Sequence, residues 1–372
     1  MSSPHEKECK SKTSRRLGTL VFLSSIVYLL VLAGVLWSLM HCTEKQWYFG
    51  ALLYLPADGW LIPLVILAPV ALLVRPWVCL LHVVAVAMVF VGYMEANGPG
   101  SKPAPTVEGL EDAARLTVVT ANIGQRSLRK LETFIQAQQP DVVAFQEGGM
   151  LPKKLLQGIN DYEFRRESEF SLISRLPITE SGIVLDIDYK GRPVAAWFEL
   201  EYTGRRIVIY SVHMPTPRSF LMELEPGNSG GGEYISSEGC EDFKNYWSIR
   251  FDLMRRLMAV LRAEKRPMLV VGDLNTPDAG GLYQMLAAEY QDSYAEAGSG
   301  GGATFPGNSR SVLFISGPWL RLDYLFASSD WVPMECFVET PTRAQHLAVL
   351  GRFALLEPDE DQGSGIAKAA TR

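Results

Sequence analysis

The stretch PMLVVGDLN, residues 267–275, is a short apolar run that ends abruptly in polar residues. Such a run, bounded by turn-forming residues, is typical of a buried strand, so we predict a strand followed by a tight polar turn. A packed sheet gains nothing from a carboxylate or a carboxamide at the strand end. Asp273 and Asn275 are therefore the first candidates for a functional site.

Three other predicted strands end in polar residues in the same way: LTVVTANI at Asn122, DVVAFQE at Glu147 and RIVIYSVHM at His213. Strand ends of a sandwich or an α/β sheet gather at one rim, so we expect these side chains to converge. Taken singly, each has a plainer explanation as a turn cap, a loop start or an Asx turn. Taken together, they make an oxygen-rich pocket that suits a hard cation such as Mg²⁺ better than zinc.

The rest of the polar part alternates short strands with helices. Apolar spacing predicts helices over residues 127–139 and 241–264, and the Thr203-Gly204 turn between two apolar runs predicts a β-hairpin. We therefore predict an α/β fold with mixed, largely antiparallel sheets over residues 116–356. Residues 214–240 form a long Gly-rich loop, which is either a functional lid or a plain surface insertion.

The second predicted helix carries a charge on its apolar stripe. Trp247, Met254 and Leu257 share one face, and Arg250 falls on the same face. A guanidinium in an apolar setting needs a partner. Arg250 is therefore either paired structurally or directed into the site to bind substrate.

The N-terminal part of the chain is strongly apolar. Leu17–Met40 is an uncharged run of 24 residues, against about 20 needed to cross a bilayer. Residues 51–74 and 77–94 are apolar runs of similar length. We predict three transmembrane helices within residues 17–96, with a single re-entrant hairpin as the alternative for the second and third.

The flanking charges predict the orientation of this membrane domain. Five basic residues precede the first apolar run, so we expect a cytoplasmic tail over residues 1–16. Three crossings would then place the polar domain on the extracytoplasmic side of a cell membrane. Residues 97–115 are Gly- and Pro-rich and predict a linker, and residues 357–372 predict a disordered tail.

Charge and cysteine content narrow the function classes. Residues 101–372 carry 28 Lys and Arg against 36 Asp and Glu, a net charge of −8. An acidic domain repels the phosphate backbone of a nucleic acid, so the charge disfavours a basic surface that encloses nucleic acid. For the same reason, any chemistry on a phosphate group would need a cation. The cysteines form no CxxC or His-spaced pattern, so a sulfur-bound zinc site is not expected, and pairing of Cys240 with Cys336 stays open.

The polar residues at the strand ends, and their order along the chain, resemble the motifs of the endonuclease/exonuclease/phosphatase superfamily over about residues 116–356. VVGDLNTP resembles its Gly-Asp-x-Asn motif, DVVAFQE its Gln-Glu motif, and TANI the Asn of its first strand. RLDYLFAS resembles the Arg-x-Asp-Tyr block, and ATFPG the segment often found before it. The last family motif is Ser-Asp-His, and this chain reads Ala344-Gln345-His346, so the His is kept and the Asp is not.

This resemblance implies a four-layer α/β sandwich and a divalent ion, Mg²⁺ or Mn²⁺, held by Glu147 with help from Asn122. It gives the remaining motif residues catalytic roles around a phosphate, with metal-activated water as the nucleophile. Asp273 would hold or deprotonate the water and Asn275 would bind the phosphate or orient Asp273. His213 would donate to a phosphate oxygen. His346, fixed by Asp323, would bind the phosphate or act as acid or base.

Combined with the predicted membrane domain, which the resemblance does not cover, the implied function is a membrane-anchored, metal-dependent phosphoester hydrolase. Its expected partners are a membrane and a phosphoester substrate, either a phospholipid head group or a nucleic acid. An extracytoplasmic nuclease acting on DNA or RNA is the alternative enzyme. Because Gln345 removes one negative charge, a degenerate binding module that has lost its metal is the alternative of another class.

Overall fold

The structure, a computed structural model, describes residues 4–41, 47–94, 113–124, 128–148, 161–217, 237–300, 302–307, 317–340 and 344–357. Most of the predicted linker 97–115, loop 214–240 and tail 357–372 lies outside the described residues.

Two mixed sheets form the centre of the polar part. The larger sheet contains β12 (Gly298–Ser299), β14 (Trp331–Val338), β15 (Val349–Leu355), β1 (Arg115–Asn122), β2 (Val142–Gln146), β4 (Phe170–Ser174) and β3 (Glu163–Glu167), in that order. The smaller contains β11 (Gln291–Asp292), β13 (Asp323–Ala327), β10 (Met268–Asp273), β9 (Arg205–His213), β8 (Ala195–Tyr202) and β5 (Ile178–Ile183). A separate two-stranded ribbon pairs β6 (Asp188–Tyr189) with β7 (Arg192–Pro193). Parallel pairs join β1 to β2, β9 to β10 and β12 to β14, and antiparallel pairs join the others, so the predicted mixed fold is confirmed.

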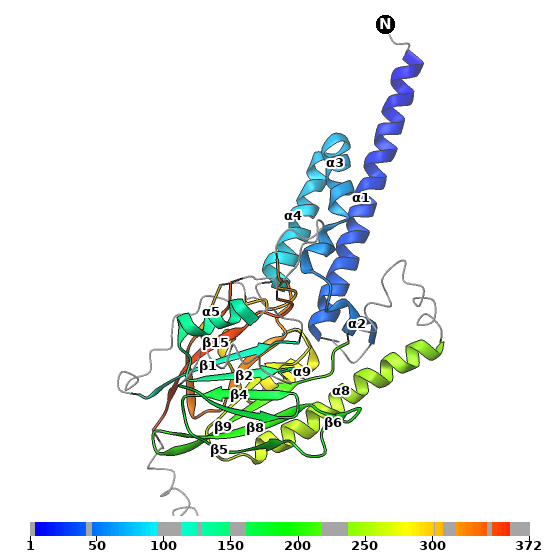
Figure 1. The fold of residues 1–372 in the computed structure, drawn as a ribbon. Helices are drawn as coiled ribbons and strands as arrows, with labels where there is room; N and C mark the ends of the chain where they lie inside the picture. The colour runs from blue at the N-terminus through cyan, green and yellow to red at the C-terminus, as the bar shows by residue number, and fades with distance from the viewer. Residues whose placement is uncertain are drawn as a thin grey trace, which may run out of the picture.

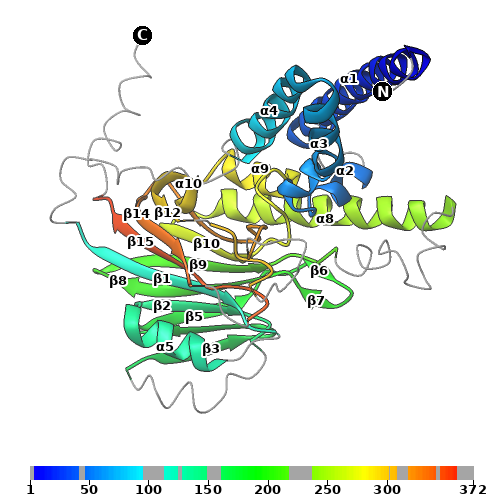
Figure 2. The ribbon, with the colours of Figure 1, turned by 90° about the horizontal axis from the view of Figure 1, so that it is seen from above.

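The polar part has four layers. The inner faces of the two sheets share one apolar core. Leu131 and Ile135 of α5 (Leu128–Gln138) pack on the outer face of the larger sheet. Helices α8 (Ser237–Ala263) and α9 (Gly281–Ala287) pack on the outer face of the smaller sheet, and Figure 2 shows α5 and α8 on opposite sides of the sheets. A further short helix, α10 (Ser293–Ala297), contacts β14 of the larger sheet.

Local sequence explains which strands were predictable. Thr203 and Gly204 both have positive φ, as a two-residue hairpin turn requires, and β8 pairs with β9 as predicted. Strand β3 carries no apolar alternation, since Glu163 to Arg166 are exposed, and it was not predicted. The run GIVLDIDY, residues 182–189, predicts one strand by its apolar residues, but that prediction is wrong in its centre, because β5 ends at Ile183 and β6 begins only at Asp188.

The N-terminal helical unit comprises residues 4–41 and 47–94. Helix α1 (Pro4–His41) contains Arg15–His41, the one helix in the described part of the chain that is long and apolar enough to cross a membrane. Large apolar side chains such as Leu23 and Leu30 are exposed along it. The first predicted membrane helix therefore exists as a helix of suitable length.

The prediction of three such helices is wrong. The second apolar run is divided into α2 (Trp47–Leu52), η2 (Ala57–Leu61) and α3 (Leu64–Val74), and the third into η3 (Pro76–Val78), α4 (Cys79–Ala87) and η4 (Met88–Met94). Both apolar helices that result, Asp58–Val74 and Pro76–Val91, are shorter than a membrane-spanning helix. A proline accounts for the break between them, because Pro76 disfavours the helical region for the residue before it. Pro56 and Pro63 stand directly before η2 and α3, and Arg75, before Pro76, has an extended φ of −160°.

The two shorter helices form a hairpin beside α1. Figure 1 shows α3 and α4 lying along the half of α1 nearer the sheets. The open end of the hairpin, at Leu61 and Met88, packs with Leu39 of α1, and its turn packs with Val21. The first residues of α3 and the last residues of the hairpin therefore both lie at the end of α1 that faces the polar domain.

Candidate active site

Strand register aligns three candidate residues at one rim. Asp273 at the end of β10 is paired with Asp323 of β13 on one side and with His213 of β9 on the other. In the other sheet, Asn122 ends β1 beside β2, after which Glu147 follows. Because the two sheets pack face to face, these two sets of strand ends meet.

Asn122 joins the two sheets at this rim. Its amide Nδ2 donates to Oε1 of Glu147 at 3.1 Å and to Oδ2 of Asp273 at 3.0 Å. The backbone N–H of Gly124 donates to its Oδ1 at 3.1 Å, which fixes the orientation of the amide. The predicted convergence of Asn122, Glu147 and Asp273 is confirmed.

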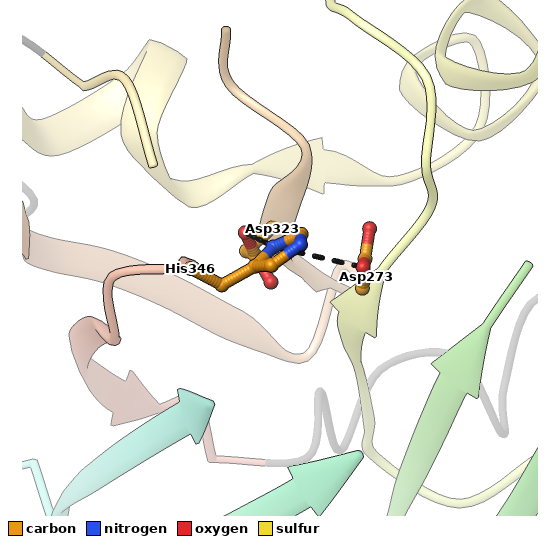
Figure 3. A group of neighbouring side chains, drawn as sticks. All are labelled: Asp273, Asp323 and His346. Atoms are coloured by element: carbon orange, nitrogen blue, oxygen red, sulfur yellow. Dashed lines mark hydrogen bonds and ion pairs between the residues drawn. The ribbon is translucent and has the colours of Figure 1, made fainter. Parts of the chain in front are cut away.

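Asp323 and Asp273 flank the imidazole of His346. Nδ1 of His346 lies 3.0 Å from Oδ2 of Asp323 and 3.6 Å from Oδ2 of Asp273, and Figure 3 shows the three side chains converging. Burial by itself lowers the pKa of His346, but the charges of Asp323 and Asp273 outweigh it and raise this pKa to about 9. The predicted His346–Asp323 hydrogen bond is confirmed, and it favours a charged imidazole.

His213 has a partner that sequence reasoning missed. Its Nδ1 lies 2.8 Å from Oε1 of Glu169, and its Nε2 lies 3.7 Å from Oε1 of Glu147. Burial opposes the charge on His213, but the Glu169 hydrogen bond and the carboxylates around it raise its pKa. Glu169 follows Ser168, whose φ is positive, in the turn between β3 and β4. Because β3 itself is exposed and patternless, no signal in the sequence marked that turn.

Asn275 orients Asp273 through its backbone. Its N–H donates to Oδ1 of Asp273 at 2.7 Å, and its side-chain amide donates to the carbonyl of Met214 at 2.8 Å. Its φ of 46° is left-handed, which asparagine tolerates better than most residues. Of the two roles considered for Asn275, this geometry favours orienting Asp273 over binding phosphate.

Arg250 lies behind the site. It is completely buried, and its Nη2 donates to the carbonyl of Asn275 at 2.5 Å, while the guanidinium stacks on Trp247 with a centroid distance of 4.6 Å. A substrate cannot reach a side chain with no exposed surface. The position of Arg250 therefore gives no support to the predicted substrate-binding role and favours a structural one.

The segment ATFPG supports the histidine site from one side. Oγ1 of Thr304 accepts from the backbone N–H of Asp323 at 3.3 Å, and the Phe305 ring centroid lies 4.9 Å from that of His346. Gln345, which stands where the family motif has Asp, is half-buried, and its backbone carbonyl accepts from Gly307 at 2.7 Å.

The donor set fits a divalent cation. Asp273, Asp323 and His346 place possible ligand atoms within 4.8 Å of one another. Because a charged His346 has no free lone pair, the ligands left for a cation are carboxylate oxygens, and Oδ1 of Asp323 is buried without a hydrogen-bond partner among the described residues. The Glu147 carboxylate is 39% exposed and rests over Gly124, where an added Cβ would lie 1.9 Å from Oε2. Carboxylate oxygens at such density are stabilised by a hard cation.

A family comparison agrees with this geometry. The model of the Endonuclease/Exonuclease/phosphatase family matches residues 119–344. No curated protein matches the chain.

Solved structures with similar chains were also found. An endonuclease/exonuclease/phosphatase family protein from Leptotrichia buccalis is 17% identical, with a TM-score of 0.47 over 64% of this chain and 100% of that one. The family protein from Bacteroides vulgatus is 17% identical, with a TM-score of 0.45 over 65% and 99% of the two chains. D. rerio TDP2 complexed with single strand DNA product is 16% identical, with a TM-score of 0.45 over 64% and 99%.

Proposed function

The chain belongs to the endonuclease/exonuclease/phosphatase family, and from this premise we propose that it is a membrane-anchored, Mg²⁺-dependent hydrolase of phosphoester bonds. Members of this family are typically phosphoester hydrolases and generally use divalent metal ions. The observation that carries the proposal is the convergence of Asn122, Glu147 and Asp273 with the His346–Asp323 pair at one rim.

Glu147 would hold the ion, with Asn122 fixing its carboxylate through the Nδ2 hydrogen bond. When bound, such an ion supplies positive charge that stabilises phosphoryl oxygens. The amide of Asn122 holds Glu147 and Asp273 in fixed positions relative to each other. The geometry of the site is therefore set by the protein before substrate enters.

The proton roles follow from charge. Burial, together with the charge of Asp323, raises the pKa of Asp273, which makes this carboxylate a better base than an exposed one. His346, with a pKa of about 9, is protonated near neutral pH and suits donation to a phosphate oxygen. We therefore assign Asp273 to receive the proton of the attacking water, and His346 and His213 to donate to the phosphate.

We propose that the N-terminal helical unit lies in the membrane with the catalytic domain outside the cytoplasm. Gly18 of α1 lies near Arg75 in the hairpin turn, so Arg15, Arg16 and Arg75 gather at the turn end of the hairpin, away from the catalytic domain. Basic residues favour the cytoplasmic side. Because the hairpin enters and leaves on the domain side, this orientation is the same whether the hairpin crosses the bilayer or only enters it.

The substrate class is proposed from location. The site loop at Asn275 contacts Tyr54 of the N-terminal helical unit at 2.6 Å, and the domain is acidic overall. Both features support a phosphoester at the membrane surface, such as a phospholipid head group, over a nucleic-acid backbone.

The test uses the full-length protein in detergent micelles. Hydrolysis is measured on phospholipid vesicles, inositol phosphates, a chromogenic phosphodiester and plasmid DNA, with Mg²⁺ or with EDTA, for the wild type and Asp273→Asn. We expect Mg²⁺-dependent hydrolysis of the lipid that Asp273→Asn abolishes. Preferential cleavage of DNA would identify a nuclease instead, and EDTA-resistant activity or none on any phosphoester would contradict the proposal.

A further inference from the structure

The N-terminal helical unit touches the active-site loop through a tyrosine. Tyr54, between α2 and η2, donates its hydroxyl hydrogen to the carbonyl of Asn275 at 2.6 Å. Arg250 of α8 donates to the same carbonyl at 2.5 Å and to the Tyr54 hydroxyl at 3.4 Å. One carbonyl of the site loop thus receives a donor from each part of the chain.

This contact belongs to a packed junction. Nε1 of Trp319 donates to the backbone carbonyl of Tyr54 at 3.2 Å. Gly50 of α2 lies against the Trp247 ring, which an added Cβ would approach to 3.1 Å. Ala279, four residues beyond Asn275, is buried in the apolar cluster of the N-terminal helical unit. The tyrosine is therefore held in place from the side of the catalytic domain as well as from its own helices.

Asn275 connects Tyr54 to Asp273, the proposed base. The carbonyl of Asn275 is held by Tyr54 and Arg250, and its N–H donates to Oδ1 of Asp273 at 2.7 Å. A left-handed non-glycine residue costs energy and persists only where its surroundings hold it. We infer that Tyr54 is a positioning residue: by holding Asn275, the N-terminal helical unit fixes the orientation of Asp273, so full activity requires that unit to be docked.

The kinetic test of this inference rests on the proposed function. Tyr54→Phe removes only the hydroxyl, and Tyr28→Phe is the matched control, because Tyr28 donates to the carbonyl of Trp60 at 2.9 Å within the same unit. A single hydrogen bond of this kind corresponds to roughly a three- to tenfold change. In full-length protein we expect kcat of Tyr54→Phe to fall by roughly that factor with KM unchanged, and Tyr28→Phe to match the wild type.

A second measurement does not depend on activity. Hydrogen exchange at the Asn275 amide, in the metal-free protein, should accelerate in Tyr54→Phe and not in Tyr28→Phe, with the unfolding temperature of both retained. Trp319→Phe, which frees the Tyr54 backbone, should show the same pattern more weakly, and it serves if Tyr54→Phe does not fold. The inference is overturned if exchange at Asn275 is unchanged, or if exchange accelerates while kcat stays at the wild-type value. An inactive wild type with accelerated exchange in Tyr54→Phe would instead refute the proposed hydrolase and leave the positioning contact demonstrated.

Discussion

Asp323 holds His346 by a hydrogen bond of 3.0 Å between Oδ2 and Nδ1, and the same nitrogen lies 3.6 Å from Asp273. A carboxylate in this position fixes the tautomer of an imidazole and stabilises its positive charge. Both effects leave Nε2 of His346 as the nitrogen available to a substrate.

Asp323→Asn should therefore fold normally and turn over at least about 10²-fold more slowly. The physical reason is that the amide no longer compensates the charge of His346, whose pKa falls from about 9. The measurement is kcat on the best substrate, with circular dichroism as the folding check. Asp330→Asn is the control, because Asp330 accepts from Ser328 and ion-pairs with Arg205, away from the site. Equal loss in both variants would argue for a general stability effect.

Glu169→Gln should change the pH dependence of activity. Glu169 raises the pKa of His213, so its neutralisation lowers that pKa, and the donor loses its proton at a lower pH. The alkaline limb of kcat/KM should then move to lower pH, with little change at the acidic end. Glu167→Gln, at a carboxylate that accepts from Ser181 and not from a histidine, should leave the profile unmoved. An unshifted limb in Glu169→Gln would remove His213 from the proposed proton donors.

Gly124→Ala should weaken metal binding without removing a ligand. The new Cβ would stand 1.9 Å from Oε2 of Glu147, so the carboxylate must move. We expect the Mg²⁺ concentration for half-maximal activity, and the Kd for Mn²⁺ by calorimetry, to rise by roughly 10-fold or more. Gly34→Ala provides the comparison, since nothing lies within 4 Å of an added Cβ there. Wild-type Mn²⁺ affinity in Gly124→Ala would place the ion away from Glu147.

The orientation of the chain is open to a reporter test. Alkaline phosphatase fused to the C-terminus should be active in cells, because this reporter folds only outside the cytoplasm. A fluorescent protein that matures only in the cytoplasm should be dark when it is fused at the same place. The reverse pattern would place the catalytic domain in the cytoplasm and refute the proposed topology.

The sequence by itself determined the strands that carry the site, because each is a short apolar run with a polar residue at its end. Asn122, Glu147, His213 and Asp273 could be chosen on that pattern alone. The resemblance to the family motifs then added Asp323 and His346, which lie far from the other four residues in the sequence. These predictions succeed because strand period and burial are local properties of the chain.

Only the tertiary structure decided which partners those residues have. Glu169 reaches His213 from a turn without any pattern, and Tyr54 reaches Asn275 from 221 residues away. The apolar stripe of α8 predicts that Arg250 needs a partner, but only the structure shows that this partner is a backbone carbonyl. The second and third apolar runs were long enough to span, but the helices they form, Asp58–Val74 and Pro76–Val91, are shorter than a membrane-spanning helix. Hydropathy counts side chains and registers neither where a helix ends nor a contact between distant segments, and both are settled only when the chain packs.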